Sequence, residues 1–550
     1  MVVVGVVAVT VIRAISAARE LQSDIAVAQG HATSVNMAAL SDDLPVVRES
    51  ALALVEVTDG PVWQVLNRIP WLGTTTTSVA ALGQTAAAVS AAGMETRPIL
   101  ASLTADGIRA DDGVIDTGLL REVGDRLSAT APLLEPAAEA VQEADPDAIG
   151  PVGDASRQAR EWIKDLPEQT RTAAQATAIA AEALGADEPK QTVILLQNGS
   201  EARGTGGFMG GYTMVTTDQG ALTVDRTDTN NSLDTPIPNQ GMPRSFYQLW
   251  GRGETAEWNS FNQTRHFPFV GHLSAAGMRE RETPVDQVLA TDAYGVAALL
   301  AATGPVSAGG VTVTADDAVT FFNQTVYEQY PDVARKDEVV AQLMQAVTQR
   351  LGTGDVDLPA LVRAMTPVVT EGRLVMWSAD AEAQAQLETW PVGGAVPLDR
   401  GPWAAVALNN STANKLDAYV ASAVSYDADT CGGVSSVTVT LTNNSPEPAA
   451  DERFAQEVLA GPVGTTRMMV DVYGPVGAEW KSARIDGKRE FVWQGRERNH
   501  PVWKYDLTMA RGQTSSLTVE FKEPPTEGRD PVLFRQAMAV PQVAVATRSC

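Results

Sequence analysis

The spacing of hydrophobic and polar positions divides the chain into three regions. Between residues 14 and 188, Ala, Leu and Val recur at intervals of three and four, the period of amphipathic helices. Between residues 190 and 400, apolar runs such as "QTVILLQN" and "VDQVLATD" alternate with helical stretches, which is typical of an α/β sheet with helical cover. Between residues 403 and 550, period-two runs such as "VSSVTVTLTNN" and "SSLTVEFKE" are spaced like the strands of a sandwich. The pattern predicts a multidomain α + α/β + β protein: an N-terminal helical bundle or stalk, a central α/β sheet domain with the ligand-binding or catalytic site, and a C-terminal β-sandwich-like domain.

Two features of the helical region predict where its helices stop. Pro45 and the "IPWLG" segment (Ile69–Gly73) each interrupt the helical period, and we expect a break at both. The region has no clustered His, Cys or paired carboxylates at metal-binding spacing. We therefore expect a scaffold rather than a reactive site in this part of the chain.

The N-terminal stretch "MVVVGVVAVTVI" is apolar and ends at Arg13. Twelve helical residues reach roughly 18 Å, which is short of a hydrocarbon core of about 30 Å. No basic residue precedes the stretch, so it does not have the form of a signal peptide. We interpret residues 1–13 as a partial membrane anchor of a single-pass protein, with the rest of the chain on one side of the membrane. A buried helix and a strand are the alternatives.

Composition and charge narrow the classes of partner. The content of 44% hydrophobic and 20% charged residues is that of a folded protein. A net charge of −26 argues against nucleic acid, whose phosphates need a basic surface. The two cysteines, Cys431 and Cys550, are too few for a disulfide scaffold. They could form one disulfide in an oxidising compartment or remain as two thiols.

The segment "LLQNGSEARGTGGFMGGY" (Leu195–Tyr212) contains the densest pattern of unusual residues. It is not a dinucleotide fingerprint, because Met209 occupies the third glycine position, and it is not a P-loop, because no Gly-Lys pair follows. Two interpretations remain open. The segment is either a ligand-binding loop or a structural turn. In the second interpretation the side chains of Asn198 and Glu201 brace the backbone, and Gly206 and Gly207 supply a turn or bulge.

Arginine and carboxylate side chains are the candidate chemistry of the central region. Histidine catalysis is not indicated, since the chain has four histidines in no recognisable motif. Arginine offers planar, bidentate donors suited to phosphate oxygens, and carboxylates are ligands for hard divalent cations. The arginines are Arg203, Arg226, Arg244, Arg252, Arg265, Arg279, Arg281 and Arg335, and the carboxylates are Asp218, Asp225, Asp228 and Asp234. A pyrophosphate–Mg²⁺ site is one interpretation, and surface arginines paired with acids are the other.

The segment "QNGSEARGTGGFMGGY" resembles the signature N-x-x-E-x-R-x-x-G-G-F of a bacterial family known as domain of unknown function 4012. The apolar start, the Ala-rich helical region, "VDQVLATDAYGVAALLAATGPV" and the β-rich end are also similar to that family. The resemblance implies a membrane-anchored, extracytoplasmic protein of the cell envelope with no settled activity.

The central region also resembles, more faintly, the LytR-CpsA-Psr phosphotransferases, which move glycans from a polyprenyl-pyrophosphate carrier to the cell wall. The similarity lies in the order hairpin, "TVDRTDT", long loop, basic helix and "VDQVLATDAYGVAALLAATGPV". It implies Arg226, Asp228 and Arg203 as catalytic residues, with Asp228 binding Mg²⁺. It implies Arg265, Arg279, Arg281 and Asn262 as substrate-binding residues. Where that family has an Asp-Thr pair, this chain has "GGFMGGY".

Two functional hypotheses follow from the sequence. In the first, the protein transfers a glycan from polyprenyl pyrophosphate to a cell-wall polymer with the help of Mg²⁺. In the second, it is a non-catalytic surface protein, binding or structural, with a degenerate phosphotransferase-like domain. The positions of Arg203, Arg226, Arg265 and Arg279 discriminate between them, because the first hypothesis needs these side chains in one pocket beside an aspartate.

Overall fold

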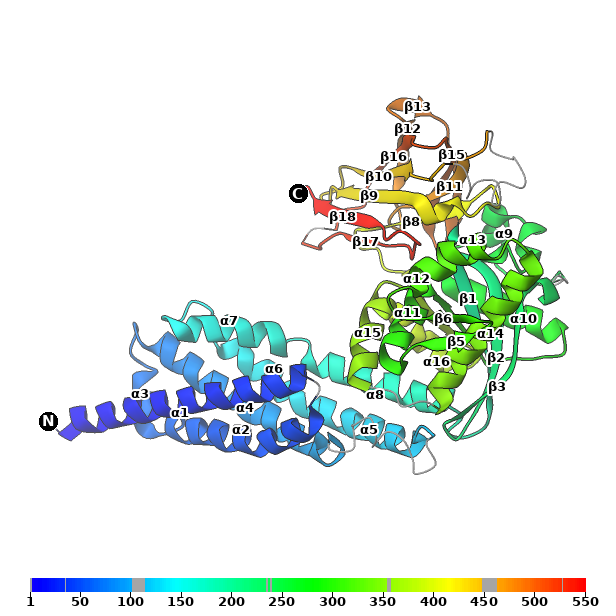
Figure 1. The fold of residues 1–550 in the computed structure, drawn as a ribbon. Coiled ribbons are helices and arrows are strands. Elements are labelled where there is room, and N and C mark those ends of the chain that lie inside the picture. Colours follow the sequence, from blue (N-terminus) through cyan, green and yellow to red (C-terminus); the bar gives the residue numbers. More distant parts are fainter. Residues whose placement is uncertain are drawn as a thin grey trace. The chain divides into compact units, whose positions relative to one another are not determined.

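The computed structural model describes residues 2–34, 36–100, 114–233, 236–237, 240–353, 358–447, 462–526 and 528–550. The chain divides into two compact units (Figure 1). Unit 1 consists of Met1–Pro189 together with the short segment Asp218–Ala221. Unit 2 consists of Lys190–Thr217 and Leu222–Cys550, so the central and C-terminal regions belong to the same unit.

Unit 1 is helical, as the three-four periodicity predicts. Apolar side chains of the first, second and fourth helices form one of its cores, which includes Leu21, Ala51 and Leu54. The described helices are α1 (Val2–Thr33), α2 (Met37–Thr58), α3 (Pro61–Leu66), α4 (Gly73–Leu100), α5 (Thr117–Thr130), α6 (Glu135–Ala140), α7 (Pro151–Ile163) and α8 (Leu166–Ala183).

The two predicted helix breaks have different outcomes. The chain does leave the helix between α3 and α4, around Ile69–Gly73. The prediction at Pro45 is wrong, because α2 continues through this residue. Val47, Ala51 and Leu54 beyond the proline are buried, and their packing supports a helix that proline alone disfavours.

The expectation of a membrane anchor is contradicted. In the residues that the structure describes, no helix combines the length and the apolarity needed to cross a bilayer. The apolar N-terminal stretch is instead the first part of α1, and the same helix carries Arg13, Arg19 and Glu20. These charges end the apolar run too early for a bilayer core of about 30 Å. The expectation of a transmembrane helix, and with it that of a single-pass membrane protein with its bulk outside the cytoplasm, is therefore wrong.

A five-stranded sheet in the order β3-β2-β1-β4-β7 forms the centre of the first part of unit 2. The long strand β1 pairs antiparallel with β2 and parallel with β4, and β7 pairs antiparallel with β4. A tight turn at Gln219 and Gly220 joins β2 to β3. The strands are β1 (Lys190–Arg203), β2 (Gly206–Asp218), β3 (Ala221–Thr229), β4 (Gln287–Asp292) and β7 (Leu374–Ser378).

Helices cover both faces of this sheet, because β1 is apolar on both. Val193 and Leu195 pack with residues of α9 and α10, whereas Leu196 packs on the opposite core of α11 and α14. The elements are α9 (Arg244–Trp250), α10 (Phe267–Glu280), α11 (Ala293–Thr303), β5 (Val306–Ala308), β6 (Val311–Val313), α12 (Ala318–Thr320), α13 (Val326–Gln329), α14 (Val333–Thr353), α15 (Leu358–Thr370) and α16 (Ala381–Leu387). A π-helical segment (Phe321–Thr325) links α12 to α13. The region is thus an α/β sheet domain with helical cover.

The rest of unit 2 contains a six-stranded sheet, β13-β12-β16-β10-β9-β18, and a five-stranded sheet, β14-β15-β11-β8-β17. One apolar core takes side chains from both sheets, among them Val439, Val470 and Phe521. The strands are β8 (Trp403–Asn410), β9 (Val420–Ala428), β10 (Val434–Asn443), β11 (Thr466–Tyr473), β12 (Glu479–Ile485), β13 (Lys488–Glu490), β14 (Trp493–Glu497), β15 (His500–Met509), β16 (Thr514–Lys522), β17 (Val532–Phe534) and β18 (Val543–Arg548).

The tip of the β2–β3 hairpin belongs to unit 1 rather than to its own sheet. The backbone N–H of Gln219 donates to the carbonyl of Gly185 at 3.0 Å, and that of Gly220 donates to the carbonyl of Leu184 at 2.9 Å. These bonds satisfy polar groups of the turn with the end of α8.

Candidate functional site

The signature residues lie at the end of the first hairpin of the central sheet, where β1 and β2 meet the C-terminal sheets. β1 ends at Arg203, Gly204 and Thr205 form the connection, and β2 begins at Gly206. The residues from Gly199 to Gly207 are all buried. The hairpin end is therefore an internal junction of unit 2 and not a loop at its surface.

Glu201 is held between two cations. Nη2 of Arg203 lies 2.6 Å from Oε1 of Glu201, and Nζ of Lys415 contacts Oε2. Both cations also lie over the ring of Phe208, at 5.6 Å and 5.0 Å from its centroid. Burial by itself would raise the pKa of Glu201, but the charges of Lys415 and Arg203 outweigh it and lower the pKa. Glu201 is thus an ionised carboxylate with both oxygens occupied by partners within the chain.

The backbone of the hairpin end is bonded to the C-terminal region. The N–H of Ala202 donates to Oδ2 of Asp417 at 2.8 Å, and the N–H of Gly204 donates to Oδ1 of Asn409 at 2.9 Å. Nε2 of Gln536 donates to the carbonyl of Arg203 at 2.7 Å. Nη1 of Arg203 donates to the carbonyl of Asn410 at 3.3 Å. Every one of these bonds joins the signature to residues more than 200 positions away in the sequence.

The carboxyl group of Asp417 has a raised pKa. Burial raises its pKa to about 6, although hydrogen bonds from the N–H of Ala202 and from Nδ2 of Asn410 act in the opposite direction. The negative charge of Glu201 adds to the increase in pKa, and the positive charge of Arg203 reduces it. The junction therefore contains a carboxyl group that titrates near neutral pH.

Close backbone packing explains the glycines of the signature. A Cβ atom on Gly204 would lie 2.1 Å from the carbonyl oxygen of Gln263, and one on Gly207 would lie 2.1 Å from that of Asn198. Gly206 has φ +143, and a Cβ atom there would lie 2.5 Å from Oε1 of Gln197. Only glycine fits at these positions, for reasons of space that need no ligand.

Asn198 braces the same turn through its side chain. Its Oδ1 accepts hydrogen bonds from the backbone N–H of Ser200 at 3.0 Å and from the Ser200 hydroxyl at 2.7 Å. Its Nδ2 donates to the hydroxyl of Tyr327. The amide thus ties the irregular part of β1 to α13.

Asn262 and Arg265 lie in the loop that precedes α10. Both side chains bond other residues of the same chain at the junction. Nδ2 of Asn262 donates to the carbonyl of Gly207 at 2.9 Å. Nη2 of Arg265 donates to the carbonyl of Arg535 at 2.7 Å, and the guanidinium lies 4.2 Å from the ring centroid of Phe534. Burial lowers the pKa of Arg265 to about 10. In the resemblance these two residues bind substrate, whereas here they pack the junction.

The other predicted arginines lie elsewhere. Arg226 is exposed on β3 with its guanidinium 5.3 Å from the ring centroid of Tyr212. Arg279 is exposed at the end of α10, and Nη1 of Arg281 donates to the carbonyl of Gly277 at 3.0 Å. The chain runs from α10 to Asp286, which bonds Gln191 at the start of β1.

The α10 arginines are therefore at the opposite end of the sheet from Arg203. Gln191 and Arg203 lie 12 positions apart on the 14-residue strand β1, which corresponds to roughly 40 Å of extended chain. Of the four discriminating arginines, the structure brings only Arg203 and Arg265 to the junction.

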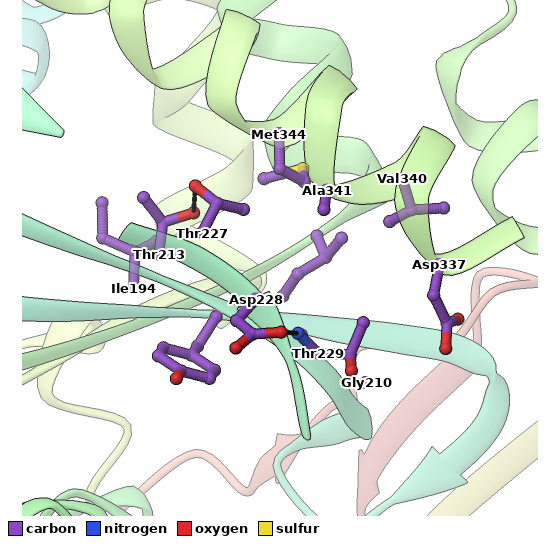
Figure 2. Close-up of a pocket in the computed structure, with 13 residues that line it drawn as sticks. Ile194, Gly210, Thr213, Thr227, Asp228, Thr229, Asp337, Val340, Ala341 and Met344 are labelled. Carbon is purple, nitrogen blue, oxygen red and sulfur yellow. Dashed lines mark hydrogen bonds between the residues drawn. The ribbon is translucent and has the colours of Figure 1, made fainter. Parts of the chain in front are cut away.

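A small hollow lies between the sheet and α14 (Figure 2). Its cavity volume is about 30 Å³, enough for about two water molecules. Asp228 and Asp337 both contribute to the lining, and Thr213 and Thr227 lie near Met344. Oδ1 of Asp228 accepts the N–H of Thr229 at 2.8 Å. Arg203 and Arg265 are not among the lining residues, so the hollow does not unite the predicted catalytic set.

The carboxylates expected to hold Mg²⁺ do not form a ligand set in the described part of the chain. Oδ2 of Asp225 accepts the hydroxyl of Thr216 at 2.7 Å, and Asp218 is exposed at the hairpin tip. Asp234 lies outside the described residues. Because Mg²⁺ commonly takes only one or two protein carboxylates and completes its shell with water and phosphate, the Mg²⁺ site at Asp228 stays a prediction.

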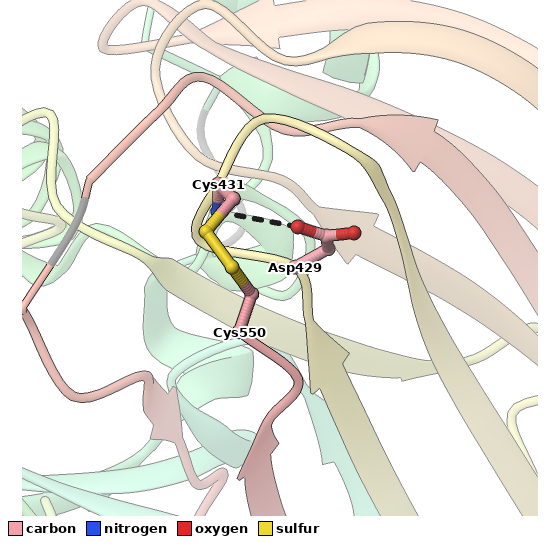
Figure 3. A group of neighbouring side chains, drawn as sticks. All are labelled: Asp429, Cys431 and Cys550. Atoms are coloured by element: carbon pink, nitrogen blue, oxygen red, sulfur yellow. Dashed lines mark hydrogen bonds between the residues drawn. A yellow bond between two sulfur atoms is a disulfide. The ribbon is translucent and has the colours of Figure 1, made fainter.

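Cys431 and Cys550 form a disulfide with a Cα–Cα distance of 5.9 Å (Figure 3). The bond closes a loop with a sequence separation of 119 and attaches the chain end after β18 to the turn between β9 and β10. Asp429 lies beside the two sulfur atoms, but its Oδ1 accepts the N–H of Cys431. Because the sulfurs are bonded to each other, they are not thiolate ligands for a metal.

The sequence did not predict which residues bond the signature segment. They come from the C-terminal region: Asn409, Asn410, Lys415, Asp417 and Gln536. The segment "LNNSTANKLD" contained a signal for these residues, because its polar side chains follow directly on the apolar run of β8. A second missed feature is the buried pair of Arg373 and Asp292, whose Nη1 and Oδ2 atoms are 2.5 Å apart.

Residues 187–327 match the model of a family described as Protein of unknown function (DUF4012). The match begins just before β1 and ends within α13, so it includes the whole signature hairpin. Over these residues it confirms the family that the signature predicts. Comparison with curated proteins and with solved structures gave no match.

Proposed function

We propose that this protein is a non-catalytic binding or structural protein in which the family signature locks the central sheet onto the C-terminal sheets. The observation that carries the proposal is the buried ion pair of Arg203 with Glu201, whose carboxylate also binds Lys415. A guanidinium that is satisfied by a buried internal carboxylate has little capacity left for a pyrophosphate.

Two further observations support the proposal. The arginines named by the phosphotransferase resemblance are distributed over both ends of the central sheet, whereas charge neutralisation of one pyrophosphate needs them within a few ångströms of the same oxygens. Asn262 donates to a backbone carbonyl of the chain through Nδ2, and Arg265 does so through Nη2. In this proposal the central domain is a degenerate relative of the phosphotransferases and has kept the sheet without the chemistry.

The C-terminal region is, in the same proposal, a β-sandwich that presents an outer face to a partner. The support is the single apolar core to which both sheets contribute. The inner faces are thereby used for stability. The outer face of the five-stranded sheet carries a second buried cluster that includes Trp403, Ala405 and Tyr473, so the proposed binding face is the outer face of the six-stranded sheet.

The experiment is an assay of the folded full chain with a polyprenyl pyrophosphate-linked glycan and Mg²⁺, followed by measurement of released phosphate and of transferred glycan. We expect no turnover above a protein-free control. Turnover that disappears in Arg226→Ala and Asp228→Ala, with the thermal melting temperature unchanged, would contradict the proposal and restore the transferase hypothesis. Both residues lie on β3 at the surface or partly exposed, so these substitutions should leave the fold intact.

A further inference from the structure

Two large aromatic side chains are exposed side by side near the edges of the C-terminal sheets. Phe491 is 72% exposed and Trp493 is 74% exposed. Their ring centroids are 6.5 Å apart with an interplanar angle of 70°. Val492 between them is fully buried, so in this extended segment its two neighbours point the opposite way, to solvent. Such rings give up a large hydrophobic gain by staying in water, which a purely structural role does not explain.

Two arginines lie next to these rings. Arg489 lies on β13, two residues before Phe491, and is exposed. In the register of β12 with β13, Arg484 is directly opposite Arg489. Like charges in opposite cross-strand positions are destabilising. Neither side chain has an ion pair or hydrogen bond with any residue in the described ranges.

We call Arg484, Arg489, Phe491 and Trp493 the arginine–aromatic face. Its two arginines are cations without an ion pair among the described residues of a chain with a net charge of −26. Opposed arginines and exposed aromatic rings are both unfavourable for stability, and both occur at the same place in the fold. This combination has the donors for an anion and, a few residues away, flat apolar surfaces for a ring.

The charge of the whole chain decides which anionic partner fits. An extended anionic surface such as a lipid bilayer would face the net charge of −26 across an area much wider than the face, and would be repelled. A single narrow polymer would contact only the arginine–aromatic face, so it would interact mainly with the positive charge of the two arginines. An acidic peptide would satisfy the arginines but offers no flat surface to the rings. Sugar rings carry C–H groups with partial positive charge that suit the negative face of an aromatic ring.

We propose that the arginine–aromatic face binds an anionic polysaccharide. The rings of Phe491 and Trp493 pack against sugar rings, and the guanidinium groups of Arg484 and Arg489 bind its carboxylate, phosphate or sulfate groups. This goes beyond the role proposed for the signature and does not depend on it, since none of the four residues contacts the junction.

The test measures binding of the full chain to dextran sulfate, with uncharged dextran, polyglutamate and phosphatidylglycerol vesicles as comparison probes. The variants are Phe491→Ala/Trp493→Ala and Arg484→Gln/Arg489→Gln. Matched controls are Trp71→Ala, which removes a ring that is 73% exposed in unit 1, and Arg13→Gln, which removes an exposed arginine there. All are surface changes, and thermal melting checks that each variant is folded.

We expect dextran sulfate to bind, and each double variant to weaken that binding roughly tenfold while the two controls leave it unchanged. Absence of dextran sulfate binding would overturn the proposal. So would equal binding of polyglutamate with no effect of the ring variant, which would indicate an acidic peptide. Vesicle binding that is lost in the ring variant would indicate a lipid surface instead.

Discussion

Nη2 of Arg203 lies 2.6 Å from Oε1 of Glu201, and both side chains are buried where the central sheet meets the C-terminal sheets. The pair is formed within the family signature itself, two residues apart on β1. It answers the question that the glycine-rich segment raises, because the arginine binds a carboxylate of its own strand. The predictions below test how much the fold depends on this arrangement.

Glu201→Gln should strongly destabilise unit 2. The amide keeps the shape of the side chain but removes the charge that compensates Arg203 and Lys415. Breaking a buried ion pair from one side costs about 3–5 kcal/mol, because it leaves an uncompensated charge inside the protein. The measurement is urea unfolding followed by circular dichroism. Glu338→Gln removes the partner of exposed Arg335 and is the matched control, with an expected loss of about 0–1 kcal/mol. Equal losses in the two variants would contradict the internal lock.

Gly207→Ala should destabilise the protein without changing its surface. The new methyl group would overlap the carbonyl oxygen of Asn198, which belongs to the paired strand and cannot move away freely. We expect a loss of about 3 kcal/mol, at the upper end for overpacking. Gly253→Ala is the control, because nothing lies within 4 Å of its Cβ position. Thermal melting of the two variants checks the difference. Similar melting temperatures would show that the backbone at Asn198 can move to accommodate the methyl group at position 207.

Asp417 should make stability fall as pH rises toward neutrality. Its folded pKa of about 6 lies above the ordinary aspartate value of 3.8, so between these two pH values the folded chain binds more protons than the unfolded chain. Stability contributed by the bound proton is present below about pH 4 and is lost as pH rises through about 6. A shift of this size corresponds to about 3 kcal/mol.

The comparison of wild type with Asp417→Asn isolates this group from other buried carboxyls. The amide can still accept from Ala202 through Oδ1, so the fold should persist. Unfolding free energies measured from pH 4 to 7 should fall more steeply in the wild type. Parallel curves for the two proteins would show that Asp417 does not titrate in this range.

Reduction of the disulfide should lower stability without removing the fold. The bond closes a loop with a sequence separation of 119, and chain entropy sets an upper limit of about 5 kcal/mol for its contribution. Thermal melting with and without a reducing agent measures the effect. In Cys431→Ser/Cys550→Ser the reducing agent should make no difference. A wild type that melts identically under both conditions would mean that the bond does not constrain the unfolded chain.

The sequence was sufficient for the order of structural classes and for several elements of the central region. The alternation of apolar runs with helical stretches predicted the strand ending at Asp292 and the helix that follows it. The helix N-terminus is explained by Asp292, whose carboxylate accepts from the N–H groups of Tyr294 and Gly295. These features are local, so a local pattern contains the information for them.

The candidate site could be predicted only in part, because its partners are distant in the sequence. Asn198, Glu201 and the glycines belong to a recognisable signature, but nothing near Arg203 indicates that Asn410, Asp417 or Gln536 would contact it. The resemblance to phosphotransferases assigned Arg265 to a substrate, and its burial against Phe534 depends on tertiary packing that no periodicity reports. The membrane expectation was wrong, because α1 continues with charged residues beyond the apolar start.

The hairpin tip that belongs to unit 1 has a practical consequence for dividing the protein. A truncated version starting at residue 190 would keep β2 and β3 but lose the Gly185 and Leu184 carbonyls that bond Gln219 and Gly220. A version ending at residue 189 would lose the turn whose N–H groups donate to these carbonyls. A single cut therefore cannot separate the two units cleanly, and expressing either half alone calls for a redesigned β2–β3 turn or for the tip to be supplied in trans.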